Sequence, residues 1–173
     1  MSAQLEVERI LRVDHAGERG AVSIYTAQIA VSKYLWPDCV PALEDMLSHE
    51  KAHFLIFESE LKNRNVRHCY ALPLWSFGGA VLGLITALFG PKAIWSCTAA
   101  VESTVYKHLV EQIEFLEQHD KTALLAVKAI EQDEKSHLEH ALAHGGASVG
   151  INKLVWVIVS SCTFIAIWLS RRL

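Results

Sequence analysis

The sequence predicts an all-α protein, a four-helix bundle with two additional hydrophobic helices. Three observations support this fold class. Four long segments carry apolar residues at helical spacing, two shorter segments contain no charged residue, and one pattern of carboxylates and histidines occurs twice. At 173 residues the chain is long enough to bury a substantial core, so we expect a single domain over residues 1–173.

The four amphipathic segments are recognised by apolar residues that recur every three or four positions. In the first segment Leu11, Val22 and Ile29 share a stripe with Glu18, and Pro37 follows its end. The other three segments also place a glutamate in the middle of an apolar stripe. The predicted bundle helices span residues 5–34, 40–63, 92–119 and 122–143.

Two uncharged runs predict hydrophobic helices over residues 74–89 and 154–170. The first would be about 24 Å long, short of the roughly 30 Å needed to span a membrane. The second is at the lower limit for a span, with Trp156 and Trp168 near its ends and basic residues on both sides. We expect both helices to associate with a membrane surface. Two alternatives stay open: a buried crossover helix for the first, and packing on the bundle or in a homodimer interface for the second.

A Glu-x-x-His pattern places both side chains about one turn apart on one helix face, and it occurs twice in this sequence. The two copies are 84 residues apart. A lone glutamate precedes each copy by 32 residues, so these glutamates are also 84 apart. This agreement in register indicates an internal duplication. The six residues concerned are Glu18, Glu50, His53, Glu102, Glu134 and His137.

The electrostatics of these six residues favour a metal site. Each isolated charge buried in an apolar core costs several kcal/mol, and like charges close together add to that cost. Two divalent cations would balance the four carboxylates. Carboxylate and imidazole ligands without a thiolate suit iron or manganese, and two glutamates with two Glu-x-x-His pairs form the ferritin-like di-metal arrangement. We therefore expect all six to be metal ligands, with their bridging or terminal roles undecided.

Other polar residues are candidates for supporting roles. Asp133, directly before Glu134, is placed to orient a ligand imidazole. The remaining histidines, His49 among them, are expected to lie at the surface or to have their hydrogen bonds satisfied. For the tyrosines a core position with a bonded hydroxyl is an equal alternative. Candidate contacts to the site or to a substrate are His15, His108, Tyr25 and Tyr106.

Composition excludes some classes of function. A net charge of −3 gives no basic surface for nucleic acid. The four cysteines form no C-x-x-C pair, which favours a reducing compartment over a disulfide framework. The first ten residues contain charges and enter a helical pattern at once, which is not typical of a signal or transit peptide. We expect a bacterial cytoplasmic-side protein, although a trimmed organellar form would look the same.

The chain resembles the demethoxyubiquinone hydroxylases, carboxylate-bridged di-iron monooxygenases of ubiquinone biosynthesis. The resemblance covers essentially the whole chain. It is carried by the stretch from Arg12 to Glu18, by both Glu-x-x-His pairs, by Ala-Val-Glu102 and by the ending Leu169–Leu173. It implies that the six residues above bind two iron ions. It also implies that the protein uses O2 to hydroxylate the ring of a polyprenylated methoxy-methyl-benzoquinol.

The resemblance further implies where the protein acts and with what. The expected location is peripheral (monotopic), on the cytoplasmic face of a bacterial inner membrane, with the matrix side of the mitochondrial inner membrane as the alternative. Membrane lipid and other proteins of ubiquinone biosynthesis are expected partners. The sequence has no Rossmann glycine fingerprint, so a nicotinamide such as NADH would be an external reductant. The alternatives are a ferritin-like di-iron quinol oxidase and an iron-handling protein that hydroxylates no lipid.

Overall fold

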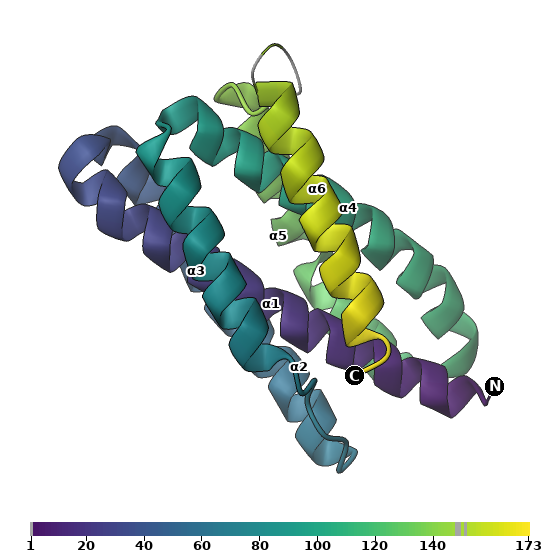
Figure 1. The fold of residues 1–173 in the computed structure, drawn as a ribbon. Helices are drawn as coiled ribbons and strands as arrows, with labels where there is room; N and C mark the ends of the chain where they lie inside the picture. The colour runs from purple at the N-terminus through teal and green to yellow at the C-terminus, as the bar shows by residue number, and fades with distance from the viewer. Residues whose placement is uncertain (1, 148–149, 151) are drawn as a thin grey trace.

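The computed structural model describes residues 2–147, 150 and 152–173, and within them it contains six α-helices, a 3-10 turn and no strand (Figure 1). The predicted all-α class is therefore confirmed. The elements are α1 (Ala3–Leu35), η1 (Pro37–Cys39), α2 (Val40–Asn63), α3 (Leu72–Leu88), α4 (Pro91–His119), α5 (Lys121–Ala143) and α6 (Asn152–Ser170).

Local chemistry explains where several helices begin and end. The Oγ of Ser2 accepts a hydrogen bond from the Leu5 amide and caps α1, so this helix begins before the predicted residue 5. Pro37 follows the end of α1 and opens the 3-10 turn. Asp120 separates α4 from α5 and caps α5, because its side chain accepts from the amides of Thr122 and Ala123.

The two halves of the chain repeat one arrangement of three helices. In the first half α1 packs against α2 and α3, and in the second half α4 packs against α5 and α6. Contacts between α1 and α4 and between α2 and α5 join the halves and close the bundle of four. Figure 1 shows the apolar helices α3 and α6 on the same side of the molecule, in front of the bundle. The internal duplication read from the glutamates therefore extends to the third helix of each half.

Two glycines bring α3 into direct backbone contact with α1. A Cβ atom added at Gly79 would lie 2.6 Å from the carbonyl oxygen of Gly20, and one at Gly83 would overlap the carbonyl oxygen of Ile24. The spacing of these glycines gives α3 a smooth stripe, of the small-xxx-small type. One face of α3 is thus held against the bundle, and its opposite face is exposed.

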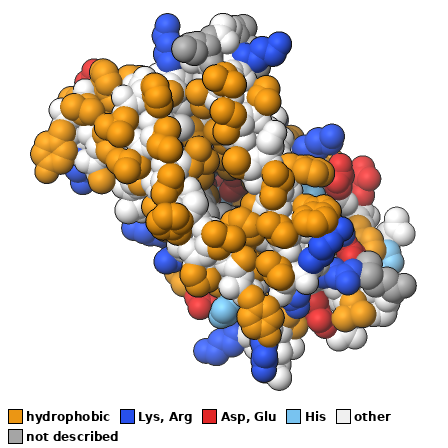
Figure 2. Space-filling view, in the orientation of Figure 1, with side chains coloured by type: hydrophobic (Ala, Val, Ile, Leu, Met, Phe, Trp, Pro, Cys, Tyr) orange, Lys and Arg blue, Asp and Glu red, His pale blue; other side chains and the backbone are white. Residues whose placement is uncertain are grey.

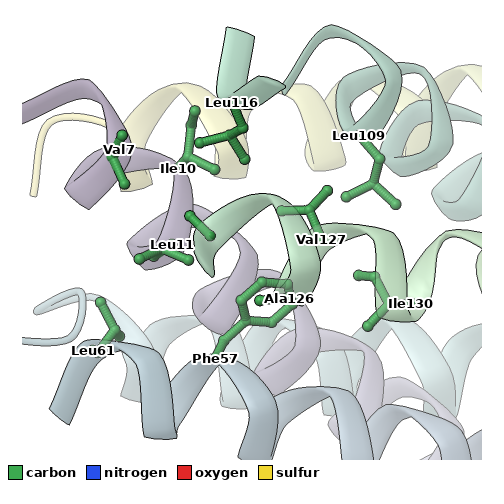
Figure 3. Packing of buried hydrophobic residues seen from close by; sticks show 11 residues of the cluster. Val7, Ile10, Leu11, Phe57, Leu61, Leu109, Leu116, Ala126, Val127 and Ile130 are labelled. Carbon is green, nitrogen blue, oxygen red and sulfur yellow. The ribbon is translucent and has the colours of Figure 1, made fainter. Parts of the chain in front are cut away.

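The core of the bundle consists of two apolar layers, one on each side of the six predicted ligands. Burying a large apolar side chain stabilises the fold by about 1.5–3 kcal/mol, so each layer contributes strongly. Along every bundle helix the ligand residues lie between the two layers. The layer drawn in Figure 3 includes Leu11, Phe57, Leu109, Leu116, Val127 and Ile130, and the other includes Tyr25, Leu43, Met46, Ile94 and Trp95.

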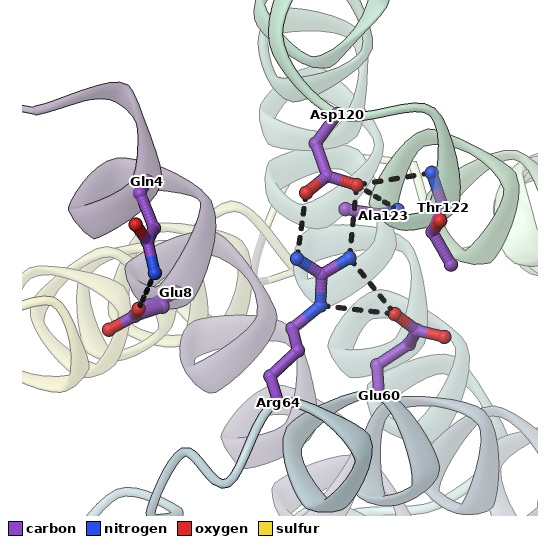
Figure 4. Close-up of polar contacts among 7 residues, drawn as sticks. All are labelled: Gln4, Glu8, Glu60, Arg64, Asp120, Thr122 and Ala123. Carbon is purple, nitrogen blue, oxygen red and sulfur yellow. Dashed lines mark hydrogen bonds and ion pairs between the residues drawn. The ribbon is translucent and has the colours of Figure 1, made fainter.

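A salt bridge fixes the end of α2 to the turn between α4 and α5 (Figure 4). The guanidinium of Arg64 donates to both carboxylate oxygens of Asp120, at 2.7 and 2.9 Å. It also donates to Glu60, one turn earlier on α2. Because Asp120 caps α5 as well, this contact aligns α2 with α5, the two helices that carry Glu-x-x-His.

The side of the molecule formed by α3 and α6 is largely apolar. Within the described residues α6 is the one helix long and apolar enough to cross a membrane, judged by length and composition, and α3 is a shorter apolar helix. Figure 2 shows hydrophobic side chains over most of this face. Exposed examples are Leu74, Phe77, Leu84, Leu88, Leu154, Ile158, Phe164 and Ile165.

Candidate metal centre

The six residues predicted as ligands converge in the middle of the bundle. Each is at most 5% exposed. They come from all four bundle helices, because each helix turns its apolar stripe inward and the ligand residue lies within that stripe. Glu18 is on α1 and Glu102 on α4, whereas α2 and α5 each contribute a glutamate and the histidine one turn later.

The side-chain atoms form two groups that share two carboxylates. In the group that we call the first position, Glu18 and His53 meet Glu50 and Glu134. In the second position, Glu102 and His137 meet the same Glu50 and Glu134. Within each group one ligand atom per residue lies within 4.8 Å of all the others. Glu50 and Glu134, one from each Glu-x-x-His pair, therefore belong to both groups.

Unbonded polar atoms at the centre of these groups fit a pair of cations. The Nδ1 atom of His53 lies 3.0 Å from Oε1 of Glu134, and Nδ1 of His137 lies 3.2 Å from Oε1 of Glu50. All four atoms are buried, and none makes a hydrogen bond among the described residues. A buried polar atom without a partner is costly. Lone pairs that face one another across such a space suit a divalent cation that accepts oxygen and nitrogen ligands.

The shifted pKa values show that several of these carboxylates are unfavourable in their charged form when only protein groups surround them. Burial, together with the charge of Glu134, raises the pKa of Glu18, Glu50 and Glu102 well above the usual range. Burial disfavours the protonated form of His53, but contacts with Glu134, Glu50 and Asp133 together outweigh it and raise the His53 pKa to about 9. A cation at each position would replace these protons as the partner of the carboxylates.

The second ring nitrogen, Nε2, of each predicted ligand histidine also has a polar partner. Nε2 of His53 lies 3.1 Å from Oδ2 of Asp133, in the arrangement expected for that aspartate. Nε2 of His137 lies 3.0 Å from Nδ1 of His49, a half-buried residue for which we predicted a surface or hydrogen-bonded position but no role at the centre. His49 precedes Glu50 as Asp133 precedes Glu134, so the 84-residue register was the signal for its role.

The sequence matches a known protein family over nearly its whole length. The sequence profile of the family described as "Ubiquinone biosynthesis protein COQ7" matches residues 5–170, nearly the whole chain. The chain belongs to the COQ7 family. The match includes all four bundle helices and both apolar helices.

Individual COQ7-type relatives cover the chain almost completely. A protein of Homo sapiens named "NADPH-dependent 3-demethoxyubiquinone 3-hydroxylase, mitochondrial" is 35% identical, over 96% of this chain and 78% of its own length. A protein of Dictyostelium discoideum with the same name is 34% identical, over 96% of this chain and 77% of its own. A bacterial relative from Rhodospirillum rubrum, "3-demethoxyubiquinol 3-hydroxylase", is 32% identical, over 96% of this chain and 78% of its own.

The other candidate residues of this COQ7-family chain lie at different distances from the centre. The hydroxyl of Tyr25 donates to Oε1 of Glu102 at 2.7 Å, so Tyr25 orients a predicted ligand. His15 is buried, but its ring stacks on Phe54 at 4.3 Å rather than joining either group. Tyr106 is half-buried and lies outside both groups.

A cavity of about 40 Å³ borders the centre. Its wall includes four of the predicted ligand carboxylates and, beside them, His108 and Asp14. Apolar side chains from α1, α4 and α6 complete the wall, with Ile167 contributed by α6. Figure 2 shows acidic atoms at the bottom of a hollow in the apolar face. The centre is therefore approached through hydrophobic surroundings.

Proposed function

We propose that this chain is a di-iron monooxygenase that uses O2 to hydroxylate the ring of a polyprenyl methoxy-methyl-benzoquinol, a late step of ubiquinone biosynthesis. The relatives named above are hydroxylases of demethoxyubiquinone or its quinol. The observation that carries the proposal is the pair of buried groups that share Glu50 and Glu134. In this proposal residues 1–173 form a single ferritin-like domain, and all six convergent residues are the iron ligands.

The chain's own residues would hold the metals and shape the site. Two bound iron ions would supply the electron transfers that activate O2. Glu50 and Glu134 would bridge the two positions, and each histidine would bind through Nδ1 because its Nε2 is already bonded. The Tyr25 hydroxyl occupies one oxygen of Glu102 and leaves the other for a cation.

The cavity is proposed as the place where the quinol ring meets the metals. At about 40 Å³ it has room for only a few water molecules, so a substituted ring would have to displace wall side chains such as Ile167 of α6. The apolar wall would exclude water from the reacting ring. His108 and Asp14 are the wall's polar side chains that are not predicted ligands, and they would bond the ring's hydroxyl groups.

The apolar face supports peripheral attachment to a membrane. A polyprenyl tail is soluble in lipid, and the hollow in this face would let the ring reach the centre while the tail stays in the bilayer. We propose the cytoplasmic face of a bacterial inner membrane. Since several relatives are named mitochondrial, the matrix side of the mitochondrial inner membrane is the alternative.

Two electrons must come from an external reductant. The described residues contain no strand, whereas the Rossmann nucleotide-binding fold is built on a sheet. Since two of the relatives are named NADPH-dependent, we propose that a nicotinamide such as NADH or NADPH donates from outside the bundle.

The test is a turnover experiment with a matched pair of variants on α5. Vesicles that contain a short-chain demethoxyquinone, the ferrous-loaded protein and a reductant are supplied with ¹⁸O2, and the product is analysed by mass spectrometry. Wild type and Glu139→Ala, which alters an exposed residue of the same helix, are expected to insert one labelled oxygen. Glu134→Ala is expected to lose both iron and product. O2 consumption without a labelled product would instead indicate an oxidase, and an active Glu134→Ala would refute the ligand assignment.

A further inference from the structure

His49 and Asp133 occupy equivalent places in the two halves of the chain. Each directly precedes the glutamate of a Glu-x-x-His pair, and they are 84 residues apart. Each also reaches across the bundle to the histidine of the opposite half, Asp133 to His53 and His49 to His137. The geometry of the duplication is thus kept, but one half uses an aspartate where the other uses a histidine.

The two contacts are alike in distance and differ in chemistry. Oδ2 of Asp133 is 3.1 Å from Nε2 of His53, and Nδ1 of His49 is 3.0 Å from Nε2 of His137. The rings of His49 and His137 are inclined by only 9°, with centroids 5.3 Å apart. Parallel rings at this separation, with nitrogens in contact, fit an N–H···N bond that runs edge to edge.

Metal binding fixes which nitrogen carries each proton. If Nδ1 of His53 and of His137 holds a cation, the remaining ring proton must be on Nε2. Both histidines then donate outward. Asp133 accepts with a negatively charged carboxylate, whereas His49 accepts with the lone pair of a neutral ring and keeps its own proton on Nε2.

A charged acceptor affects a ligand imidazole more strongly than a neutral one. Hydrogen bonds to an ionised acceptor are roughly twice as strong as those between neutral groups. A carboxylate partner also raises the basicity of the imidazole and adds negative charge near the cation. The position of Glu18 and His53 has such a partner, and the position of Glu102 and His137 has none from this pair of residues.

We propose that His49 and Asp133 are positioning residues whose different charges make the two metal positions inequivalent, with the first position binding a divalent cation more tightly. This inference rests on the proposed two-metal centre. It adds an order of filling: the first cation enters beside His53, and the second enters beside His137. Changing one of these partners is expected to shift the affinity of its position by about 10- to 100-fold.

Because positions 49 and 133 are equivalent in the duplication, exchanging their residue types gives the variants that test the proposal best. His49→Asp gives both positions a carboxylate, and an aspartate at this place should reach His137 because Asp133 reaches His53 from the equivalent place. Asp133→His gives both positions a neutral ring. His49→Gln keeps a neutral acceptor and serves as the conservative control, and His49→Ala removes the acceptor.

The measurement is an anaerobic titration of the full chain with ⁵⁷Fe²⁺, followed by chelator competition and Mössbauer spectroscopy. Wild type and His49→Gln are expected to bind in two separated steps, with one spectral environment at the first equivalent. His49→Asp should tighten the second step until both environments fill together. Asp133→His should bring the steps together by weakening the first, and His49→Ala should separate them further.

Results that contradict the inequivalence of the two positions can be distinguished from results that contradict the metal centre. Two steps of equal affinity in wild type, or unequal steps that neither exchange alters, would overturn the inequivalence and leave the metal centre standing. Absence of stoichiometric iron binding in wild type would overturn the metal centre, and the inequivalence with it.

Discussion

Replacing Gly83 with alanine tests the direct backbone packing of α3 on α1. The added Cβ would overlap the carbonyl oxygen of Ile24 and lie 3.0 Å from Cβ of Ala27. Because the nearest atom belongs to a helix backbone, relief requires α3 to move away from α1. Such overpacking typically costs about 1–3 kcal/mol, and the better helix propensity of alanine offsets about 0.5–1 kcal/mol of it. Because the overlap is with backbone, the cost lies in the upper part of that range, and the net expectation is a loss of about 1–2 kcal/mol.

Thermal unfolding followed by circular dichroism in detergent measures this loss. For a protein of this size a loss of 1 kcal/mol lowers Tm by about 2–4 °C, so Gly83→Ala should lower it by roughly 2–8 °C. Gly78→Ala is the matched control on the same helix, since a Cβ there meets no atom within 4 Å. The control should raise Tm slightly through helix propensity. A rise in Tm for both variants would refute the close approach of α3 to α1.

Further predictions concern the end of the bundle, a ligand contact and the cavity. Arg64 holds the pKa of Asp120 at about 2, below the usual aspartate value of 3.8. Because the pKa of Asp120 is lower in the folded chain than in the unfolded chain, its ionised carboxylate stabilises the fold at any pH above the unfolded-state pKa. This stabilisation is lost as the pH falls from about 4 to about 2. Asp120→Asn should therefore cost about 1 kcal/mol in urea unfolding at pH 7 and little near pH 2; a cost independent of pH would contradict this. Tyr25→Phe should keep the fold and weaken iron binding at Glu102 by about 10- to 100-fold in chelator competition, and unchanged affinity would count against the contact. Gly17→Leu should fill the cavity, where a Cβ meets no neighbour within 4 Å, and should retain iron while slowing product formation; full turnover would place the substrate elsewhere.

The convergence of the six residues could be predicted from the sequence because the duplication repeats the same glutamates and histidines at a constant interval. Apolar periodicity placed each helix, and a glutamate inside an apolar stripe had to face the interior. Two Glu-x-x-His pairs and two lone glutamates, repeated at an interval of 84 residues, define the set of six.

The partners across the bundle could not be predicted in the same way. Periodicity gives the inward face of a helix, but it does not say which residues of two neighbouring helices meet. The bonding of His49 to His137 depends on the pairing of α2 with α5, so the sequence predicted no role for His49 at the centre. Likewise, one turn of spacing from Glu18 did not show that His15 stacks on Phe54. The presence of Glu50 and Glu134 in both groups also follows from how four helices meet.

The central claim is that two iron ions lie between the two Glu-x-x-His helices and share their glutamates. Anomalous diffraction at the iron absorption edge, from crystals of the ferrous-loaded chain, tests this most directly. We predict two iron peaks in the middle of the bundle, one beside His53 and one beside His137, with Glu50 and Glu134 between them. A single peak, or iron bound away from these six residues, would contradict the account.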